Sequence, residues 1–369
     1  MLLLWIACAG TPNAPASTRA EPAMVALRPA EALPTLGPDA RVDRGLRAAA
    51  EELAAMATTP GARLTPSATR IALARAGYPG DARFLRAIGA AQPPADLLAA
   101  LPHGAAIDVG WAWRDLPDGT RWWVVGWAPR RVGMDPMPRD VTLDGGVPLR
   151  VDGAADPRLL LTSPGGAVRE VSFAAATSRW LDRFSEPGEY RVEVIDADQV
   201  DLLFSLFVET PVPPPVALPG PVTAERPEVA EASLYARLAE LRTKAGLPTL
   251  TRFPDFESHA RAHARCLSSA GVLAHDTPHC PGVPALAERT HWPRAKHHED
   301  VAAADSTAEA WERMVQSPGH LQNLLCRACS HVSVGAVLEP PRLVVAVEML
   351  EFPDGPPGAL RVEPGRGGP

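Results

Sequence analysis

The spacing of the cysteines in this chain points to disulfides, a metal site or reactive thiols. Of five cysteines in 369 residues, Cys8 stands alone and the other four lie in the C-terminal third. Pairing nearest neighbours joins Cys266 to Cys280 and Cys326 to Cys329, one of three possible connectivities. Disulfides suit an exported protein. The rivals are a four-cysteine zinc site, because Cys-Arg-Ala-Cys has metal-ligand spacing, and free or redox-active thiols.

Histidines gather in the same part of the chain. His259 and His263 lie four residues apart on one predicted helix and could chelate a metal, although the helical spacing favours His263 as a core residue. His297 and His298 are interpreted as solvated loop residues. The His298-Glu299 pair lacks a second histidine one helical turn later, so no His-Glu-x-x-His motif is present. The sequence also lacks a phosphate loop, a dinucleotide fingerprint and a Gly-x-Ser-x-Gly motif.

Composition excludes two classes of protein. The chain has 36 Lys+Arg against 43 Asp+Glu, a net charge of −7. An acidic chain without a basic block argues against binding of nucleic acid, where affinity comes from neutralising phosphates. No apolar run approaches the ~20 residues of a membrane-spanning helix. A hydrophobic share of 46% supplies real cores, and the length suits two or three domains.

Helix signals and strand patterns predict the elements that position the C-terminal cysteines and histidines. Ser306 and Glu309 frame a capping box. Ser317 can cap the next helix, in which Pro318 suits the first turn and His320 falls on the third helical position. The predicted elements are helices at Glu228–Ala245, Pro254–Ser269, Ser306–Val315 and from Ser317 onward, followed by strands at Val332–Leu338 and Leu343–Leu350.

Several motifs in this region, taken in order, resemble one family. Bacterial domains of the CAP superfamily (cysteine-rich secretory proteins, antigen 5 and pathogenesis-related class 1; the SCP-like extracellular domain) have similar runs. The matching runs are Leu234–Pro248, Ala262-His263-Ala264 with Ala274-His275-Asp276, His298-Glu299-Asp300-Val301 in place of Gly-Glu-Asn-Ile/Leu, Ala310-Trp311 leading to Ser317-Pro318-Gly319-His320-Leu321-Gln322-Asn323-Leu324, Val334-Gly335 and Ala346-Val347-Glu348.

The resemblance implies an α-β-α sandwich with a central cavity lined by two histidines and two glutamates, where some members bind a divalent metal. Carried onto this chain, it assigns His275, Glu299 and His320 to a ligand cavity and as metal ligands. The second glutamate is not found, because its position in eukaryotic members is Met314 here. Two imidazoles and a carboxylate suit Zn²⁺ with an open position. In the alternative interpretation the two histidines hydrogen-bond within the fold and hold helix to loop.

Residues 39–132 are predicted as helices followed by a β-hairpin. The strands Asp108–Trp113 and Arg121–Trp127 flank the turn Pro117-Asp118-Gly119. We expect their tryptophans to pack onto the preceding helices. The order of elements resembles a degenerate CAP domain without the cavity histidines, and an unrelated helical-plus-hairpin domain is the alternative.

Residues 138–210 contain six short apolar runs separated by turn residues, which predicts a small β-sandwich. The run Phe184–Val194 resembles the last-hairpin signature of immunoglobulin-like modules, where a Pro-Gly turn leads into a strand opened by a tyrosine. The six prolines between Pro211 and Pro221 predict a stiff linker.

The first ten residues, Met1–Gly10, resemble a bacterial lipoprotein signal with Cys8 as the acylation site. The apolar stretch is shorter than the usual ~7–15 residues and lacks a charged flank. A short buried N-terminus or a leader without function is the alternative. Export by this route would give contact with a membrane only through a lipid anchor.

The predicted fold class is therefore multidomain α+β. The predicted parts are a lipoprotein-type signal and spacer (1–38), a helical plus β-hairpin domain (39–132), an immunoglobulin-like β-sandwich (138–210), a proline-rich linker (211–227), a CAP-like α-β-α domain (228–353) and a flexible tail (354–369).

Three functions follow as hypotheses. The first is an exported protein, secreted or lipid-anchored at the bacterial cell envelope. In it a non-enzymatic CAP-like domain binds a lipid, small-molecule or protein ligand beside a His/Glu cavity able to hold zinc. The second is a metal-dependent, peptidase-like hydrolase using His275, Glu299 and His320. The third is a structural or adhesive surface protein. Because no catalytic constellation is found, the sequence favours the first over an enzyme.

Overall fold

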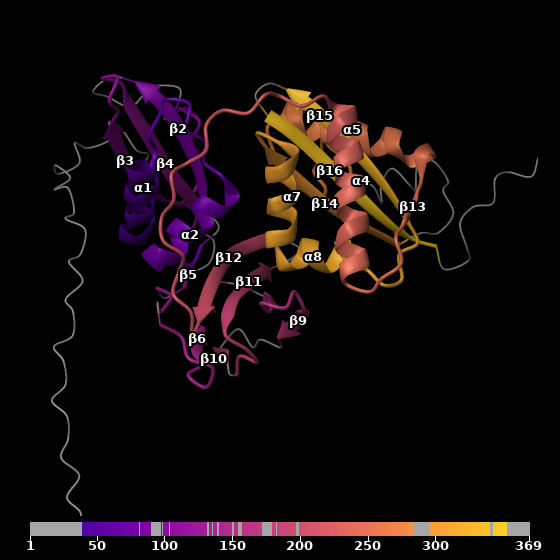
Figure 1. The fold of residues 1–369 in the computed structure, drawn as a ribbon, viewed down its shortest axis with the longest axis horizontal. Helices are drawn as coiled ribbons and strands as arrows, with labels where there is room; N and C mark the ends of the chain where they lie inside the picture. Colours follow the sequence, from indigo (N-terminus) through magenta and orange to yellow (C-terminus); the bar gives the residue numbers. More distant parts are fainter. Residues whose placement is uncertain are drawn as a thin grey trace, which may run out of the picture. The chain divides into compact units, whose positions relative to one another are not determined.

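The fold is described from a computed structural model of the chain. The described residues are 39–352 without 81, 90–96, 98, 103, 131–132, 135, 139, 150, 154–156, 172–178, 182, 197–198, 283–295 and 340–341. The predicted signal with Cys8 and the predicted tail lie outside them. Helices and strands are both abundant, so the α+β class is confirmed in its coarse form (Figure 1). No helix among the described residues has the length and apolarity needed to cross a membrane.

The first part of the described chain packs helices against one sheet, whose strand order is β1-β3-β4-β2. The predicted hairpin is present as an antiparallel β3–β4 pair. Helix α1 crosses β3 so closely that a Cβ on Gly110 would lie 2.4 Å from the carbonyl carbon of Leu46. The elements are β1 (Ala40–Val42), α1 (Arg44–Met56), α2 (Pro66–Ala76), β2 (Arg83–Gly89), β3 (Ile107–Asp115) and β4 (Arg121–Pro129).

The hairpin tryptophans do not all face the helices, so that prediction is wrong in part. Trp122 is fully buried in the apolar cluster that the strands share with α1 and α2. Successive side chains on a strand point to opposite faces. Trp123 therefore faces away from the helices, and its ring lies 5.0 Å from that of Trp113.

In the middle of the chain, the described residues form strands and no helix. Its main sheet has the order β12-β11-β8-β9, accompanied by the two-stranded pairs β10-β6 and β5-β7, and its apolar residues form a separate cluster. The elements are β5 (Gly133–Met134), β6 (Val147–Leu149), β7 (Val151–Asp152), β8 (Pro157–Thr162), β9 (Val168–Val171), β10 (Arg179–Leu181), β11 (Gly188–Asp196) and β12 (Gln199–Val208). Residues 211–226 contain no helix or strand.

The last part of the chain has helices on both faces of a sheet with the order β13-β15-β16-β14. The predicted order of helices and late strands is confirmed, with β13 and β14 in addition. The elements are α4 (Pro227–Lys244), β13 (Thr251–Arg252), α5 (Pro254–Ala270), β14 (Lys296–Ala304), α7 (Thr307–Gln316), α8 (Pro318–Leu324), β15 (His331–Glu339) and β16 (Arg342–Glu351).

Alternation along β14 and β16 gives each face of this sheet its own core. Val301, Ala303 and Ala346 pack with α5 on one face. Ala302 and Val345 pack with α4, α7 and α8 on the other. The result is an α-β-α sandwich in which β14, an edge strand, lies between two helical layers.

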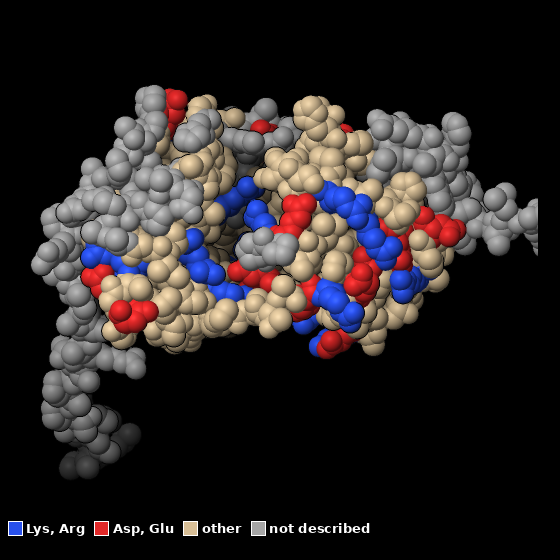
Figure 2. Space-filling view, turned by 90° about the horizontal axis from the view of Figure 1, so that it is seen from above, with Lys and Arg blue, Asp and Glu red and all other residues tan. Residues whose placement is uncertain are grey.

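On the face shown in Figure 2, Lys and Arg side chains are intermixed with Asp and Glu side chains.

Candidate functional site

Two glutamates on paired strands form the base of the candidate site. Glu299 on β14 and Glu348 on β16 are direct antiparallel partners. Directly opposed residues project to the same side of a sheet, and here that side faces α5. Glu348 is completely buried in the middle of an otherwise apolar run, where an ionised carboxyl is costly.

Helix α5 brings His263 to this pair. Its apolar side chains Phe256, Ala260, Ala264 and Leu267 face the sheet, and His263 lies among them with 2% exposure. Its Nε2 lies 3.3 Å from Oε2 of Glu299. The prediction that His263 points inward is therefore confirmed, and its ring ends at a carboxylate.

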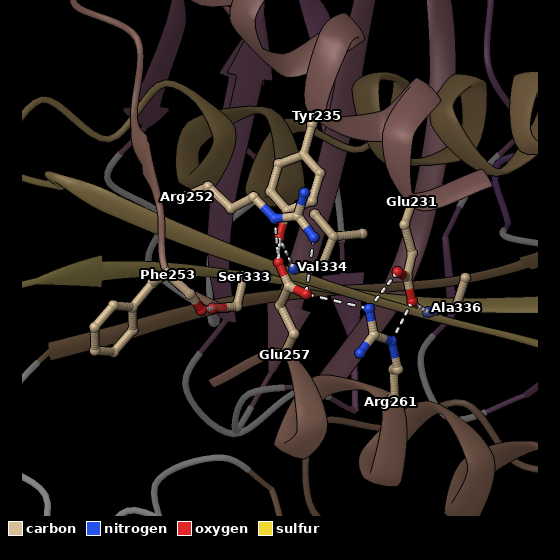
Figure 3. Close-up of polar contacts among 9 residues, drawn as sticks. All are labelled: Glu231, Tyr235, Arg252, Phe253, Glu257, Arg261, Ser333, Val334 and Ala336. Carbon is tan, nitrogen blue, oxygen red and sulfur yellow. Dashed lines mark hydrogen bonds and ion pairs between the residues drawn. The ribbon is translucent and has the colours of Figure 1, made fainter. Parts of the chain in front are cut away.

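A polar network fixes α5 against the free edge of β15 (Figure 3). Backbone N–H groups of β15 that no strand accepts donate instead to α4, from Val334 to the hydroxyl of Tyr235 at 3.0 Å and from Ala336 to Glu231 at 3.1 Å. Arg261 of α5 donates to Glu231 through two bonds of 2.6 Å. Such pairing satisfies an otherwise open sheet edge.

The loop after α5 delivers His275. A disulfide from Cys266 to Cys280 ties this loop back to the helix. The Nδ1 of His275 lies 2.9 Å from Oε1 of Glu299, and the side chain is 51% exposed. Glu299 therefore contacts one buried and one solvent-facing imidazole, one at each carboxylate oxygen.

Helix α8 delivers His320. Ser317 is the N-cap and accepts the N–H of His320 at 3.2 Å, with Pro318 in the first turn, as predicted. Asn323 on the same helix donates to Asp300 at 2.9 Å and so fixes α8 to β14. The ring of His320 meets that of His275 edge to face, with centroids 6.1 Å apart.

Burial separates the charge states of the cluster. Burial alone would raise the pKa of Glu299, but the imidazoles of His263 and His275 lower the pKa to about 2. Burial and the neighbouring charge of Glu299 raise the pKa of Glu348 well above its ordinary value. Burial, with His275 nearby, lowers the pKa of His320 to about 4. At neutral pH the site thus holds an ionised Glu299 and a neutral His320, and it favours the protonated form of Glu348.

Two buried ring nitrogens at the site, Nδ1 of His263 and Nδ1 of His320, have no hydrogen-bond partner among the described residues. Buried polar atoms are rarely left unpaired in folded proteins. Imidazole nitrogens and carboxylate oxygens are also the donors that zinc and similar divalent ions prefer. The side chains of the cluster are therefore of the kinds that bind a divalent metal.

Comparison with known families agrees with this arrangement. Residues 235–348 match the model of CAP, the cysteine-rich secretory protein family. This segment is a CAP domain. The match lies in the C-terminal part of the chain, where the motifs place it, and it includes every residue of the cluster.

Solved structures similar to the chain include three bacterial proteins. An extracellular protein containing an SCP domain from Bacillus anthracis has 14% identity, covers 60% of this chain and 67% of its own, and has a TM-score of 0.32. A cysteine-rich secretory protein from Staphylococcus aureus has 12% identity, covers 80% of this chain and 98% of its own, and has a TM-score of 0.30. An outer surface protein from Borrelia burgdorferi has 17% identity, covers 34% of this chain and 93% of its own, and has a TM-score of 0.31. No curated protein sequence matches.

The CAP domain brings the three predicted cavity residues, His275, Glu299 and His320, into one cluster. It adds two residues that the sequence prediction did not assign to the site, His263 and Glu348. Met314, at the position of the missing glutamate, is fully buried in the apolar core. The second carboxylate comes instead from β16, and the signal for it was a lone glutamate in an apolar strand.

The cysteines and the neighbouring histidines have definite places as well. The disulfides Cys266–Cys280 and Cys326–Cys329 are both present, so the nearest-neighbour pairing is confirmed. The interpretation of His297 and His298 as solvated loop residues is wrong, because both lie half-buried on β14. Strand β14 begins with a run of polar residues, so the sequence there lacks the alternation of apolar and polar residues that indicates a strand.

Proposed function

We propose that the CAP domain binds a divalent metal ion such as zinc at His275, Glu299 and His320, within an exported module that recognises a ligand. The observation that carries this proposal is the contact of Glu299 with two imidazoles beside buried donors that lack partners. His263 and Glu348 are the additional candidate ligands. When bound, a divalent ion would supply a Lewis-acidic position for an oxygen-bearing ligand.

The protonation states favour this role over a purely structural one. His320 is neutral at neutral pH, the form in which imidazole ligates a metal. Glu299 is ionised, and a metal ion bound beside Glu348 would favour loss of the proton from its carboxyl group. The exposed side chain of His275 gives solvent access to the cluster. A lipid, a small molecule and a protein remain the ligand classes.

Calorimetric titration of zinc into the oxidised full-length protein tests the metal site. We expect binding that His320→Ala and Glu299→Gln each weaken by at least about tenfold, equivalent to about 1.4 kcal/mol. The matched control is His279→Ala, which removes an exposed histidine from the loop that carries His275. Undiminished binding by His320→Ala would rule out the proposed site.

A metal-dependent hydrolase is the second candidate, because a zinc hydrolase needs a carboxylate base beside the metal. Glu348 would serve as that base once a bound cation had favoured loss of its proton. Hydrolysis of a fluorogenic peptide library by the zinc-loaded protein, lost in Glu348→Gln, would favour the enzyme. Zinc binding without hydrolysis of the library would favour the ligand-binding module.

We further propose that the protein is exported, with Cys8 as a lipid anchor, and that the middle strands form an immunoglobulin-like spacer. Two disulfides support export. The hydroxyl of Tyr190 donates to the backbone oxygen of Glu186 at 3.0 Å, as a tyrosine corner does, which supports the spacer. Radiolabelled palmitate incorporation that Cys8→Ser abolishes tests the anchor. A structural or adhesive role predicts instead that cluster variants leave surface attachment unchanged.

A further inference from the structure

A second group of metal-ligand side chains lies on the opposite face of β14. His298 precedes Glu299, and its side chain projects away from α5 toward α4, α7 and α8. Its ring nitrogen and the sulfurs of Cys326 and Cys329 lie within 4.8 Å of one another. His298 pairs with Met349, which packs in the same apolar cluster as Cys329. Cys266 and Cys280 pack on the other face, so they cannot complete this group.

The Cys326–Cys329 turn carries features that stabilise thiolates. The backbone N–H of Cys329 donates to Sγ of Cys326 at 3.1 Å. Hydrogen bonds to the charged form of a group favour that form. Arg242, completely buried, donates its Nη1 to the carbonyl oxygens of Leu324 and Cys326, each at 2.9 Å. Its Nη2 is buried with no partner among the described residues. The guanidinium cation of Arg242 therefore lies beside the turn and is not paired there with an acidic residue that the structure describes.

We propose that reduction of the Cys326–Cys329 disulfide creates a zinc site made of Cys326, Cys329 and His298. A dithiol reductant transfers two electrons and two protons to the disulfide and is itself oxidised to a disulfide. Zn²⁺ then displaces the two thiol protons and takes the imidazole as third ligand. Two thiolates and one imidazole suit tetrahedral zinc, with the fourth position open to water or a ligand.

This site is distinct from the cluster around Glu299 in ligands and in trigger. The Glu299 cluster contains no sulfur and is present in the oxidised protein, whereas the Cys326 site exists only after reduction. The two can therefore be separated by redox state and by spectroscopy.

Cobalt titration of the full chain carrying Cys8→Ser tests the site. The protein is reduced with a phosphine, freed of excess reductant without oxygen, and its thiols are counted. We expect a near-ultraviolet thiolate-to-cobalt charge-transfer band in the reduced protein only. Cys326→Ser/Cys329→Ser should abolish the band, and His298→Ala should weaken binding by at least about tenfold. Cys266→Ser/Cys280→Ser and His320→Ala should retain the band.

Alkylation of the reduced wild-type chain, mapped by mass spectrometry, gives a result that needs no variant to fold. Added zinc should protect Cys326 and Cys329 and leave Cys266 and Cys280 reactive. Fully reduced protein with no thiolate–cobalt band and no protection by zinc would overturn the proposal. Unchanged cobalt affinity in folded His298→Ala would overturn it as well.

Discussion

Glu299 and Glu348 are two acidic residues side by side that hold different charge. Glu299 contacts His263 and His275, which favour its ionised form. Glu348 is buried beside that negative charge and contacts no cation among the described residues. Two adjacent buried carboxyls cannot both ionise cheaply, so the proton stays on Glu348. Environments that push the charge states of neighbouring groups apart are a property of functional sites.

The first prediction concerns Glu348→Gln, which keeps the shape of the side chain and cannot ionise. The raised pKa of Glu348 means that the folded state holds a proton that the unfolded state releases above its ordinary pKa of ~4.5. That difference lowers wild-type stability as pH rises. We expect the variant to gain stability over wild type as pH rises above ~4.5, and the gain to vanish below that pH. Urea unfolding from pH 4 to 8 measures this, and a gain independent of pH would contradict it.

The second prediction concerns His320, whose pKa falls from an ordinary 6.5 to about 4 on folding. Between these values the unfolded chain binds a proton that the folded chain does not. The contribution of His320 is therefore fully present above pH ~6.5 and lost as pH falls toward ~4. Wild type should therefore lose on the order of 3 kcal/mol of stability through His320 as pH falls across this range, and we expect His320→Gln to lack this loss. Unfolding free energies of both proteins at several pH values measure the loss.

His279→Gln, at an exposed position in the loop of His275, is the matched control for this measurement. It should keep the slope of wild type. Parallel stability curves for His320→Gln and wild type would mean that His320 titrates normally in the folded protein.

Local signals found part of the site and missed the rest for physical reasons. Ser317 and Pro318 fix the start of α8, and so place His320, through contacts within four residues. Glu348 joins the site through the pairing of β16 with β14, across 49 residues of chain. No local pattern specifies that register. The only sequence signal for Glu348 was its place in an apolar strand, where burying a carboxyl group costs free energy.

At the scale of elements, the network in Figure 3 replaces a missing strand at the edge of β15. Glu257 on α5 lies at its centre, accepting hydrogen bonds from Tyr235 at 2.8 Å and from Arg261 at 3.1 Å, and pairing with Arg252. The network couples α4 and α5 to β15. It thereby sets the position of the helix that carries His263.

The third prediction is that Glu257→Ala destabilises the CAP domain by about 2–3 kcal/mol, because it removes the buried carboxylate that accepts from Tyr235 and pairs with the partly exposed Arg252 and Arg261. Tyr235→Phe removes a hydroxyl that donates to Glu257 and accepts from Val334, and should cost only about 1 kcal/mol. Thermal and urea unfolding measure both. A cost for Glu257→Ala no larger than that for Tyr235→Phe would show that the network is not a coupled unit.

Helices were easier to predict than strands in this domain. The starts of α7 and α8 are set by Ser306 and Ser317, whose side chains accept N–H groups as predicted. Strand β14 begins with a charged and polar run, since one face carries His298 and Asp300 and the other carries Glu299. Both faces serve polar sites, so the alternation that reveals a strand is absent.

At the scale of the molecule, residues far apart in the chain meet at the junction of α7 and α8. Glu193 of β11 is buried and accepts from the hydroxyl of Ser317 at 2.7 Å and from the N–H of Gly319 at 2.5 Å. Arg191 donates to the carbonyl of Val315, and Arg63 forms a buried ion pair with Glu309 of α7. Such contacts leave no pattern in the sequence, because each joins positions more than 100 residues apart.

The last prediction is that Glu193 positions His320 through the start of α8. A Cβ on Gly319 would lie 2.8 Å from the carboxylate of Glu193, so the two groups fit closely. Glu193→Ala leaves the Ser317 hydroxyl and the Gly319 N–H without this acceptor. We expect faster amide hydrogen exchange in α8 and, if zinc binds at His320, an affinity lower by roughly tenfold, as for loss of a group that orients a ligand. Glu170→Ala, at an exposed position on β9, should change neither. Lower stability in Glu193→Ala with unchanged exchange in α8 and unchanged zinc affinity would show that Glu193 supports packing alone, because a positioning group must alter the helix that carries the histidine.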